Sequence, residues 1–188
     1  MDRAKFYDKL RRAMFPSLSK SQVEGMEAVL NAWNEDDDIR YLAYILGTIY
    51  HECATTMQPI REFGGKAYFI RRYWDNQNVA KQLGNLSAND AQIYHGRGFV
   101  QLTGRYNYAK ASKALGIDLL GDPDKAMELD VATKILYKGM HEGWFTGKKL
   151  SDYIGESTNF VGARKIINGI DKASLIASYA NGFLTALS

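Results

Sequence analysis

The sequence is poor in cysteine and proline, and it holds no hydrophobic run long enough to cross a membrane. Its single cysteine, Cys53, excludes an intramolecular disulfide and any metal site built from several cysteines. Its three prolines form no linker that would mark a domain boundary. The longest apolar run, residues 41–50, has about half the length that a membrane-spanning helix needs. A chain of 188 residues with this composition predicts one globular domain, residues 1–188.

An export signal is also missing from the start of the chain. The first fifteen residues are charged throughout, and they lack both an apolar core and a small-residue cleavage site. We therefore expect a protein that is made in a bacterial cytoplasm and carries no Sec signal. A reducing compartment suits the lone cysteine.

Charge of either sign is modest, with 24 basic and 21 acidic residues and a formal net charge of +3. Basic residues cluster at positions 3–12 and 61–72, which favours an anionic polymer or lipid head groups, although solvated helix faces explain the clusters equally well. The absence of any recognised nucleic-acid motif argues against a nucleic-acid partner. Phe6, Leu10 and Met14 make the first helix amphipathic, so weak contact with a membrane surface is an alternative to packing on its own core.

Helical periodicity dominates most of the sequence and predicts a mainly α fold. Ser19 and Gln22 form a capping-box pattern before a second helix with Val23, Met26, Leu30 and Trp33 on one face. Further helices are expected from residue 105 to Gly116, after Asp122-Pro123, from Asp130 to Gly143, and from Asp171 to the end. Residues 59–97 lose this periodicity, so we expect an irregular or β lobe there, with a short strand pair at residues 67–74.

The third expected helix carries the first candidate for chemistry. Leu42, Ile45, Leu46 and Ile49 follow the spacing of one buried helix face. At 100° per residue, Cys53 continues the centre of that face and Glu52 falls on its edge. We expect Glu52 to be partly desolvated, which favours the protonated form that a general acid needs.

Metal and nucleophile chemistries fit the sequence poorly. Thr55 stands where an HExxH motif would place its second histidine, and the three histidines are well separated. No serine lies in a nucleophile-elbow pattern, and Cys53 is expected to point into the core. We therefore expect neither a metal nor a cofactor. Catalysis by carboxyl groups is the remaining possibility.

Glycoside hydrolysis needs two carboxyl groups, one protonated and one ionised. Glu62 suits the ionised role, because we expect it in a solvated loop beside Arg61. The alternative from the residues alone is that Glu52 is a salt-bridged helix end and Glu62 a solvated loop charge. Arg97 is expected to be a buried ion-pair partner, and Tyr94, Tyr106 and Tyr108 are more often core residues than sugar platforms.

Three blocks of the sequence carry a family resemblance. They are residues 43–63, AYILGTIYHECATTMQPIREF; residues 94–108, YHGRGFVQLTGRYNY; and residues 163–183, ARKIINGIDKASLIASYANGF. The second block resembles the signature of glycoside hydrolase family 19, which includes plant-type chitinases and phage endolysins. The resemblance spans the chain from about Lys20 onward, and it implies a mainly α, lysozyme-like single domain with a substrate cleft flanked by a small irregular or β lobe.

The resemblance also implies roles for individual residues. Glu52 matches the general acid, Glu62 is the best match to the general base, and Thr103 matches the hydroxyl that holds the nucleophilic water. Asp75 and Asp90 are alternatives for the base. Residues implied in sugar binding are Gln101, Asn107 and Asn168, with Tyr94 as a further hydroxyl at the cleft.

These expectations combine into a peptidoglycan hydrolase of the endolysin type, acting as a monomer on glycan strands in the periplasm by an inverting mechanism. Peptidoglycan is favoured over chitin by the short chain and by the lack of an export signal and of disulfides. A chitinase with the same machinery is the first alternative. The second is a catalytically silent protein that binds the cell wall or forms part of a virion.

Overall fold

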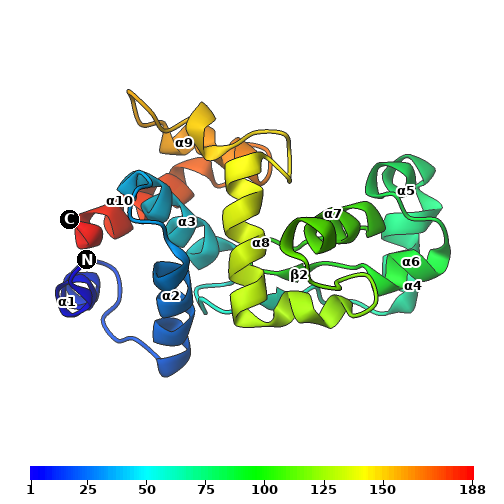
Figure 1. Cartoon of the computed structure of the whole chain (residues 1–188), viewed down its shortest axis with the longest axis horizontal. Helices are drawn as coiled ribbons and strands as arrows, with labels where there is room; N and C mark the ends of the chain where they lie inside the picture. The colour runs from blue at the N-terminus through cyan, green and yellow to red at the C-terminus, as the bar shows by residue number, and fades with distance from the viewer. The chain divides into compact units, whose positions relative to one another are not determined.

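Helices make up most of the protein in the computed structural model, which describes all of residues 1–188 (Figure 1). The chain divides into two compact units, one made of Met1–Gln58 and Leu136–Ser188 and the other of Pro59–Ile135. We call them the terminal unit and the central unit. Helix α8, Leu129–Glu142, belongs partly to each. The mainly α prediction is confirmed, whereas a single domain over residues 1–188 stays a prediction.

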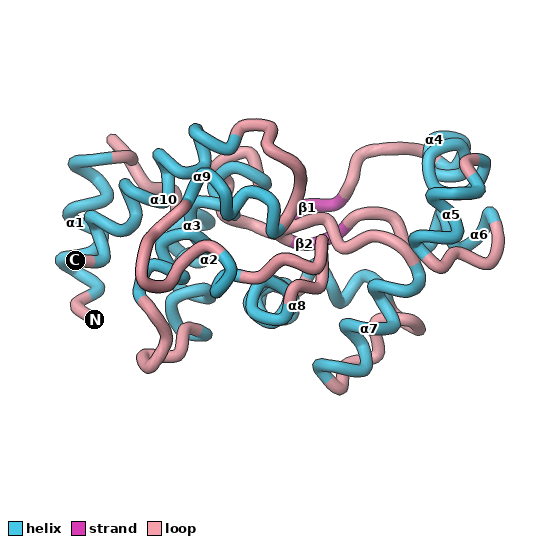
Figure 2. The backbone as a smooth tube through the Cα atoms, turned by 90° about the horizontal axis from the view of Figure 1, so that it is seen from above, coloured by secondary structure: helices cyan, strands magenta, loops and turns pink.

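The terminal unit is built around helix α3, Ile39–Glu52, which packs along the C-terminal helix α10, Ala173–Leu187 (Figures 1 and 2). The two backbones meet closely at Gly47, where an added Cβ would lie 2.7 Å from the amide nitrogen of Ala180. The unit also contains α1, Arg3–Ala13; α2, Lys20–Ala32; α9, Phe160–Ala163; and the 3-10 turns η3, Leu150–Asp152, and η4, Arg164–Ile166.

The apolar spacing of α3 produces the core of this unit. Leu42, Ile45, Leu46 and Ile49 are all completely buried, as predicted. Asp38 caps the helix by accepting from the Arg40 amide, and the predicted capping box of Ser19 and Gln22 begins α2. Such caps satisfy amides that have no partner within the helix, so they fix where each helix begins.

The central unit holds six short helices and a small sheet. Its elements are β1, Ile60–Arg61; α4, Lys66–Ile70; the π-helix η1, Arg71–Asp75; α5, Gln77–Leu83; α6, Ala88–Ile93; β2, Arg97–Gly98; α7, Arg105–Leu115; and the 3-10 turn η2, Pro123–Met127. Strands β1 and β2 run antiparallel, with Ile60 opposite Gly98 and Arg61 opposite Arg97 (Figure 2). This pairing brings residues far apart in the sequence side by side.

The predicted strand pair at residues 67–74 is wrong, because this segment forms α4 and η1. The aromatic residues of this segment suggested strands, but they are spaced so that they lie on one face of a helix and pack together there. Phe69 and Tyr73, four residues apart, stack with ring centroids 6.5 Å apart and form a buried cluster with Ala91 of α6. Tertiary packing therefore overrides the strand preference of the aromatic residues.

The irregular lobe expected at residues 59–97 is also more helical than predicted. Asn76 and Ser87 cap α5 and α6 by accepting from backbone amides, and Gly84 ends α5 in the left-handed conformation. These are ordinary start and stop signals of helices. The helices have few buried apolar residues, so periodicity alone did not reveal them.

Three predicted helix ends differ by one or two residues. Asp130, the predicted cap of α8, is the second residue of that helix. Trp33 is the extended residue that follows α2, and the residue before α10 is Lys172 rather than Asp171. The other expected helices, including α7 with its stop at Gly116, are present. None of the helices combines the length and the apolar composition that a membrane span requires.

Candidate active site

Glu52 is the last residue of α3, and its side chain is 20% exposed. This confirms the predicted partial burial at the edge of the apolar face. Its Oε1 accepts a short hydrogen bond from Nη1 of Arg164, which makes a charged pair. Next to it, Cys53 is fully buried, and burial raises the pKa of its thiol to about 12, so the thiol is not a nucleophile.

Arg164, the partner of Glu52, is the residue of this site that sequence reasoning missed. It lies at the start of η4 with only 4% of its side chain exposed, and its Nε donates to the backbone oxygen of Asp171 at 3.0 Å. A buried guanidinium needs a counter-charge, and Glu52 supplies it. The available signal was its place in the block 163–183, four residues before Asn168.

The turn after Glu52 has an uncommon backbone. Ala54, Thr55 and Met57 all have positive φ angles, between 47° and 67°, although none is a glycine. Helix α2 holds this turn, because Gln22 Nε2 donates to the oxygen of Thr55 at 2.9 Å and Gln58 Nε2 donates to Ser21. Such backbone conformations persist only where surrounding contacts fix them.

Glu62 follows strand β1 and is held by several donors. The Tyr73 hydroxyl donates to its Oε1 at 2.7 Å, and the Tyr68 hydroxyl lies 3.3 Å from the same atom. The Gly96 amide donates to Oε2 at 3.0 Å. Gly96 permits this close approach, since a Cβ there would lie 3.2 Å from Oε2 and 2.6 Å from Gln101 Oε1.

The environment predicted for Glu62 needs two corrections. Its side chain is only 15% exposed, so it is not a solvated loop charge. Arg61 does not neutralise it, because successive side chains of an extended strand point to opposite faces. Arg61 instead pairs with Asp124 at 2.9 Å and thereby lowers the pKa of that carboxyl. The cation beside Glu62 is Arg72, whose Nε lies 3.8 Å from Oε1.

The turn between β2 and α7 presents Gln101 and Thr103, as predicted. Gln101 has a φ of 56°, and its Nε2 donates to the oxygen of Ile60 at 2.9 Å, which ties the turn to β1. Thr103 donates to the oxygen of Gln101 at 2.8 Å, and Asn107 donates to the oxygen of Thr103 at 2.7 Å. Their roles with water and sugar stay predictions.

Arg97 is a buried structural residue, as expected. Its guanidinium pairs with Asp124 at 2.9 Å and donates to the backbone oxygens of Ile93 and His95. It also reaches the hydroxyl of Tyr108, and burial raises the pKa of that phenol to about 12. This network fixes the segment that carries Gly96.

Tyr94 and Asp90 belong to the framework of the central unit. Tyr94 is buried, and its hydroxyl donates to the oxygen of Leu120 at 3.2 Å. Its contact with sugar stays a prediction. Tyr106, which was expected in the core with Tyr94 and Tyr108, is instead 60% exposed. Asp90 accepts from Arg105 at 3.0 Å and from the Leu86 amide at 2.8 Å. Both oxygens of Asp90 are therefore engaged, whereas Asp75 is exposed at the end of η1.

Asn168 follows η4 in the terminal unit, and its Oδ1 accepts from the Gly169 amide at 2.8 Å. Its backbone amide donates to the oxygen of Arg164, so Asn168 shares a turn with the partner of Glu52. Contact of Asn168 with sugar stays a prediction.

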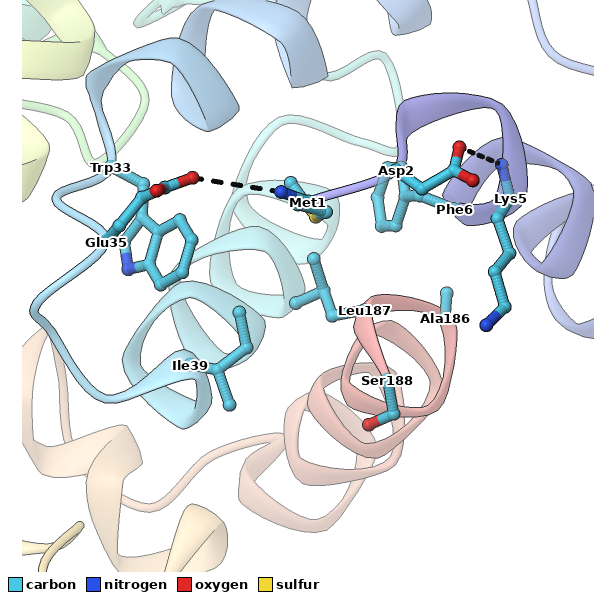
Figure 3. A pocket seen from close by; sticks show the side chains of 10 residues that line it. All are labelled: Met1, Asp2, Lys5, Phe6, Trp33, Glu35, Ile39, Ala186, Leu187 and Ser188. Atoms are coloured by element: carbon cyan, nitrogen blue, oxygen red, sulfur yellow. Dashed lines mark hydrogen bonds and ion pairs between the residues drawn. The ribbon is translucent and has the colours of Figure 1, made fainter.

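A pocket of about 470 Å³ lies elsewhere in the terminal unit. Met1, Lys5, Trp33, Glu35 and Ser188 are among its lining residues, and the N-terminal ammonium lies 3.8 Å from Glu35 (Figure 3). No residue predicted for catalysis or sugar binding lines it. No group of three or more His, Cys, Asp or Glu side chains lies where it could hold a metal ion.

The terminal unit therefore holds Glu52 against a buried cation, and the central unit holds Glu62 among hydroxyl and amide donors. Acid–base glycosidases use two carboxyl groups in different environments, one as the acid and one as the base. A protein-family model described as chitinase class I, glycoside hydrolase family 19, matches residues 24–151. The chain belongs to glycoside hydrolase family 19, and the family resemblance drawn from the sequence is confirmed.

The chain is similar to plant chitinases over part of its length. Acidic endochitinase SP2 of Beta vulgaris is 31% identical over 139 residues, which are 74% of this chain and 43% of that protein. Chitinase 8 of Oryza sativa subsp. japonica is 61% identical over 31 residues, or 16% of this chain and 12% of that protein. The chain therefore spans less than half the length of these relatives.

Solved structures share the fold. Chitinase C from Streptomyces griseus HUT6037 superposes with a TM-score of 0.66 at 20% identity, covering 99% of this chain and 76% of that one. A bacterial family 19 chitinase superposes with a TM-score of 0.62 at 24% identity, and the match covers 100% of this chain and 94% of the chitinase chain. The likeness confirms the family's mainly α fold.

Proposed function

We propose that this protein hydrolyses the β-1,4 bonds of an N-acetylated amino-sugar polymer, with Glu52 as general acid and Glu62 as general base. The observation that carries the proposal is the contrast between the two carboxyl groups. Glu52 bonds to one buried guanidinium, whereas Glu62 receives three hydrogen bonds from two hydroxyls and an amide. Membership of family 19 supports the same pair.

In the acid step, Glu52 gives its proton to the glycosidic oxygen as the bond between that oxygen and the anomeric carbon breaks. Arg164 occupies Oε1, so the carboxylate of Glu52 takes up the proton for this step on Oε2. Loss of this proton leaves a carboxylate, which the adjacent guanidinium stabilises. Arg164 thus favours the charge that develops on Glu52 as the reaction proceeds.

In the base step, Glu62 takes one proton from a water molecule, whose oxygen forms the new bond to the anomeric carbon. Hydrogen bonds from hydroxyl and amide groups favour the ionised form of a carboxyl, which is the form that a base needs. Thr103, in the central unit with Glu62, is the proposed holder of this water. The products are two shorter glycans, and attack opposite the leaving group inverts the anomeric centre.

We propose the peptidoglycan glycan strand as the substrate. Its lactyl and peptide substituents carry carboxylates, whereas chitin carries no charge. Four exposed basic side chains lie near Glu62 in the sequence. Arg61 pairs with Asp124 and Arg72 lies beside Glu62, so Lys66 and Arg71 are the cations that we expect to meet the polymer. Exposed cations attract an anionic polymer and raise its local concentration.

Chitin is the second candidate, favoured by the names of the relatives and of the solved structures. Hydrolysis of either polymer would use the same two carboxyl groups, so the reaction at the glycosidic bond does not distinguish peptidoglycan from chitin. Their difference lies in the charge of the substituents.

Contact with a membrane surface would use only part of helix α1. Phe6 and Leu10 are buried in the core of the terminal unit, so the apolar face of this helix is not available to lipid. Any such contact rests on its exposed basic residues, Lys5, Arg11 and Arg12. We propose that the protein acts as a monomer at the cell wall.

Parallel assays on purified peptidoglycan and on chitin oligomers test the proposal. We expect new reducing ends from peptidoglycan, with mass spectrometry of the released muropeptides identifying the bond, and a rate that falls with added salt. Glu62→Gln serves as the inactive control. Release from chitin alone would overturn the choice of substrate, and wall binding without release from either polymer would overturn the enzymatic proposal.

A further inference from the structure

Three side chains from one helical segment converge on Glu62. Tyr68 comes from α4, and Arg72 and Tyr73 come from η1. Two of them bond to Oε1, and the Arg72 guanidinium lies over both rings, 5.8 Å from the centroid of Tyr68 and 5.5 Å from that of Tyr73. Arg72 also donates to the Tyr68 hydroxyl at 3.1 Å.

The π-helical geometry explains how these residues reach one point. Arg72 and Tyr73 lie four and five positions after Tyr68. In an α-helix, a residue five positions on is turned by about 140° from the first. In a π-helix the hydrogen bonds run from residue i+5 to residue i. The residues four and five positions on, here Arg72 and Tyr73, then both lie on the same side of the helix as the first, Tyr68. A change from α4 to η1 thus directs both toward Glu62.

Tyr73 is fixed more firmly than its partners. Its ring is buried and stacks on Phe69, which in turn stacks on His95 with ring centroids 4.4 Å apart. Its backbone oxygen accepts from Asn85 Nδ2 at 3.1 Å. Burial, followed by the bond to Glu62, raises the pKa of Tyr73. The phenol therefore stays protonated and remains a hydrogen-bond donor.

We propose that Tyr73 is a positioning residue that fixes the orientation of Glu62, with Tyr68 and Arg72 as supporting groups. This inference rests on the proposed function, in which Glu62 is the base. Tyr73 holds Oε1 while the Gly96 amide holds Oε2, so rotation of the carboxylate would break one bond or the other. The π-turn at residues 71–75 is the local structure that makes this arrangement.

The groups that face Glu62 are Tyr68 of α4, Arg72 and Tyr73 of η1, and the Gly96 amide before β2. Tyr73 makes the shorter of the two bonds to Oε1, at 2.7 Å, and Tyr68 makes the longer, at 3.3 Å. Loss of the Tyr73 hydroxyl would therefore leave Oε1 with the weaker bond and free the carboxylate to turn.

Kinetics of Tyr73→Phe test the inference. We expect kcat to fall by about 10- to 100-fold, the cost of a misaligned catalytic group, with KM changed by less than about threefold. Tyr68→Phe removes the longer bond and should give a smaller change in the same direction. Leu86→Ala, at an exposed residue of the same unit, is the control and should match wild type.

A folded Tyr73→Phe with wild-type kcat would overturn the inference. If that variant does not fold, Tyr68→Phe and Arg72→Met at exposed Arg72 must still lower kcat with KM little changed, and a wild-type kcat in both would overturn it. Glu62→Gln separates the two claims. Wild-type activity in Glu62→Gln removes the base assignment itself, whereas an inactive Glu62→Gln beside a fully active Tyr73→Phe removes only the positioning role.

Discussion

Replacing Glu52 by glutamine should lower turnover on the glycan substrate by about 10²- to 10⁴-fold, the usual contribution of a general acid. Glutamine keeps an oxygen that can accept from Arg164, but it has no proton to give to the leaving group. Turnover is measured as new reducing ends, and KM should change little because the side chain keeps its shape.

Circular dichroism and thermal melting of Glu52→Gln control for unfolding. A matched control is Glu156→Gln, since Glu156 is an exposed glutamate of the same unit, and we expect its turnover to equal that of wild type. Near-wild-type turnover in a folded Glu52→Gln would remove Glu52 from the mechanism.

Replacing Arg164 by methionine should destabilise the protein by about 3–5 kcal/mol, because it leaves the partly buried carboxylate of Glu52 without its counter-charge. For a chain of this size the melting temperature should fall by roughly 10 °C. Turnover should fall as well, because the carboxylate that forms in the acid step loses its stabilising cation. Thermal melting and denaturant titration measure the first effect.

A double-mutant cycle separates the pair from the packing of Arg164. The variant that combines Glu52→Gln with Arg164→Met removes both charges, so it should be more stable than Arg164→Met alone. Arg12→Met serves as the surface control, since Arg12 pairs with Asp8 at an exposed position and should change stability by less than about 0.5 kcal/mol. Equal melting temperatures of Arg164→Met and wild type would contradict the role given to the pair.

Local signals in the sequence predicted much of the terminal unit. The spacing of Leu42, Ile45, Leu46 and Ile49 located the buried face of α3, and with it the edge position of Glu52. This succeeded because a long amphipathic helix records its environment in its own residues.

The central unit was harder to predict because its helices are short and their contacts come from distant residues. The aromatic residues of α4 and η1 suggested strands, and the π-turn at residues 71–75 has no periodic signature. The caps at Asn76, Gly84 and Ser87 were the usable signals for α5 and α6.

The partners of the two glutamates could not be predicted for a related reason. Arg164 lies 112 positions from Glu52, and Gly96 lies 34 positions from Glu62. Pairing across such separations depends on tertiary structure. Position in the sequence instead suggested Arg61 for Glu62, yet strand alternation turns Arg61 toward Asp124.

The anomeric form of the first product tests most directly whether Glu52 and Glu62 act as acid and base on a water molecule. Proton NMR during the first minutes of hydrolysis, before mutarotation, distinguishes the two anomers of the new reducing end. Attack by a water molecule that Glu62 activates predicts the α anomer from a β-linked glycan. Initial release of the β anomer would contradict the account, since it requires retention through a second displacement.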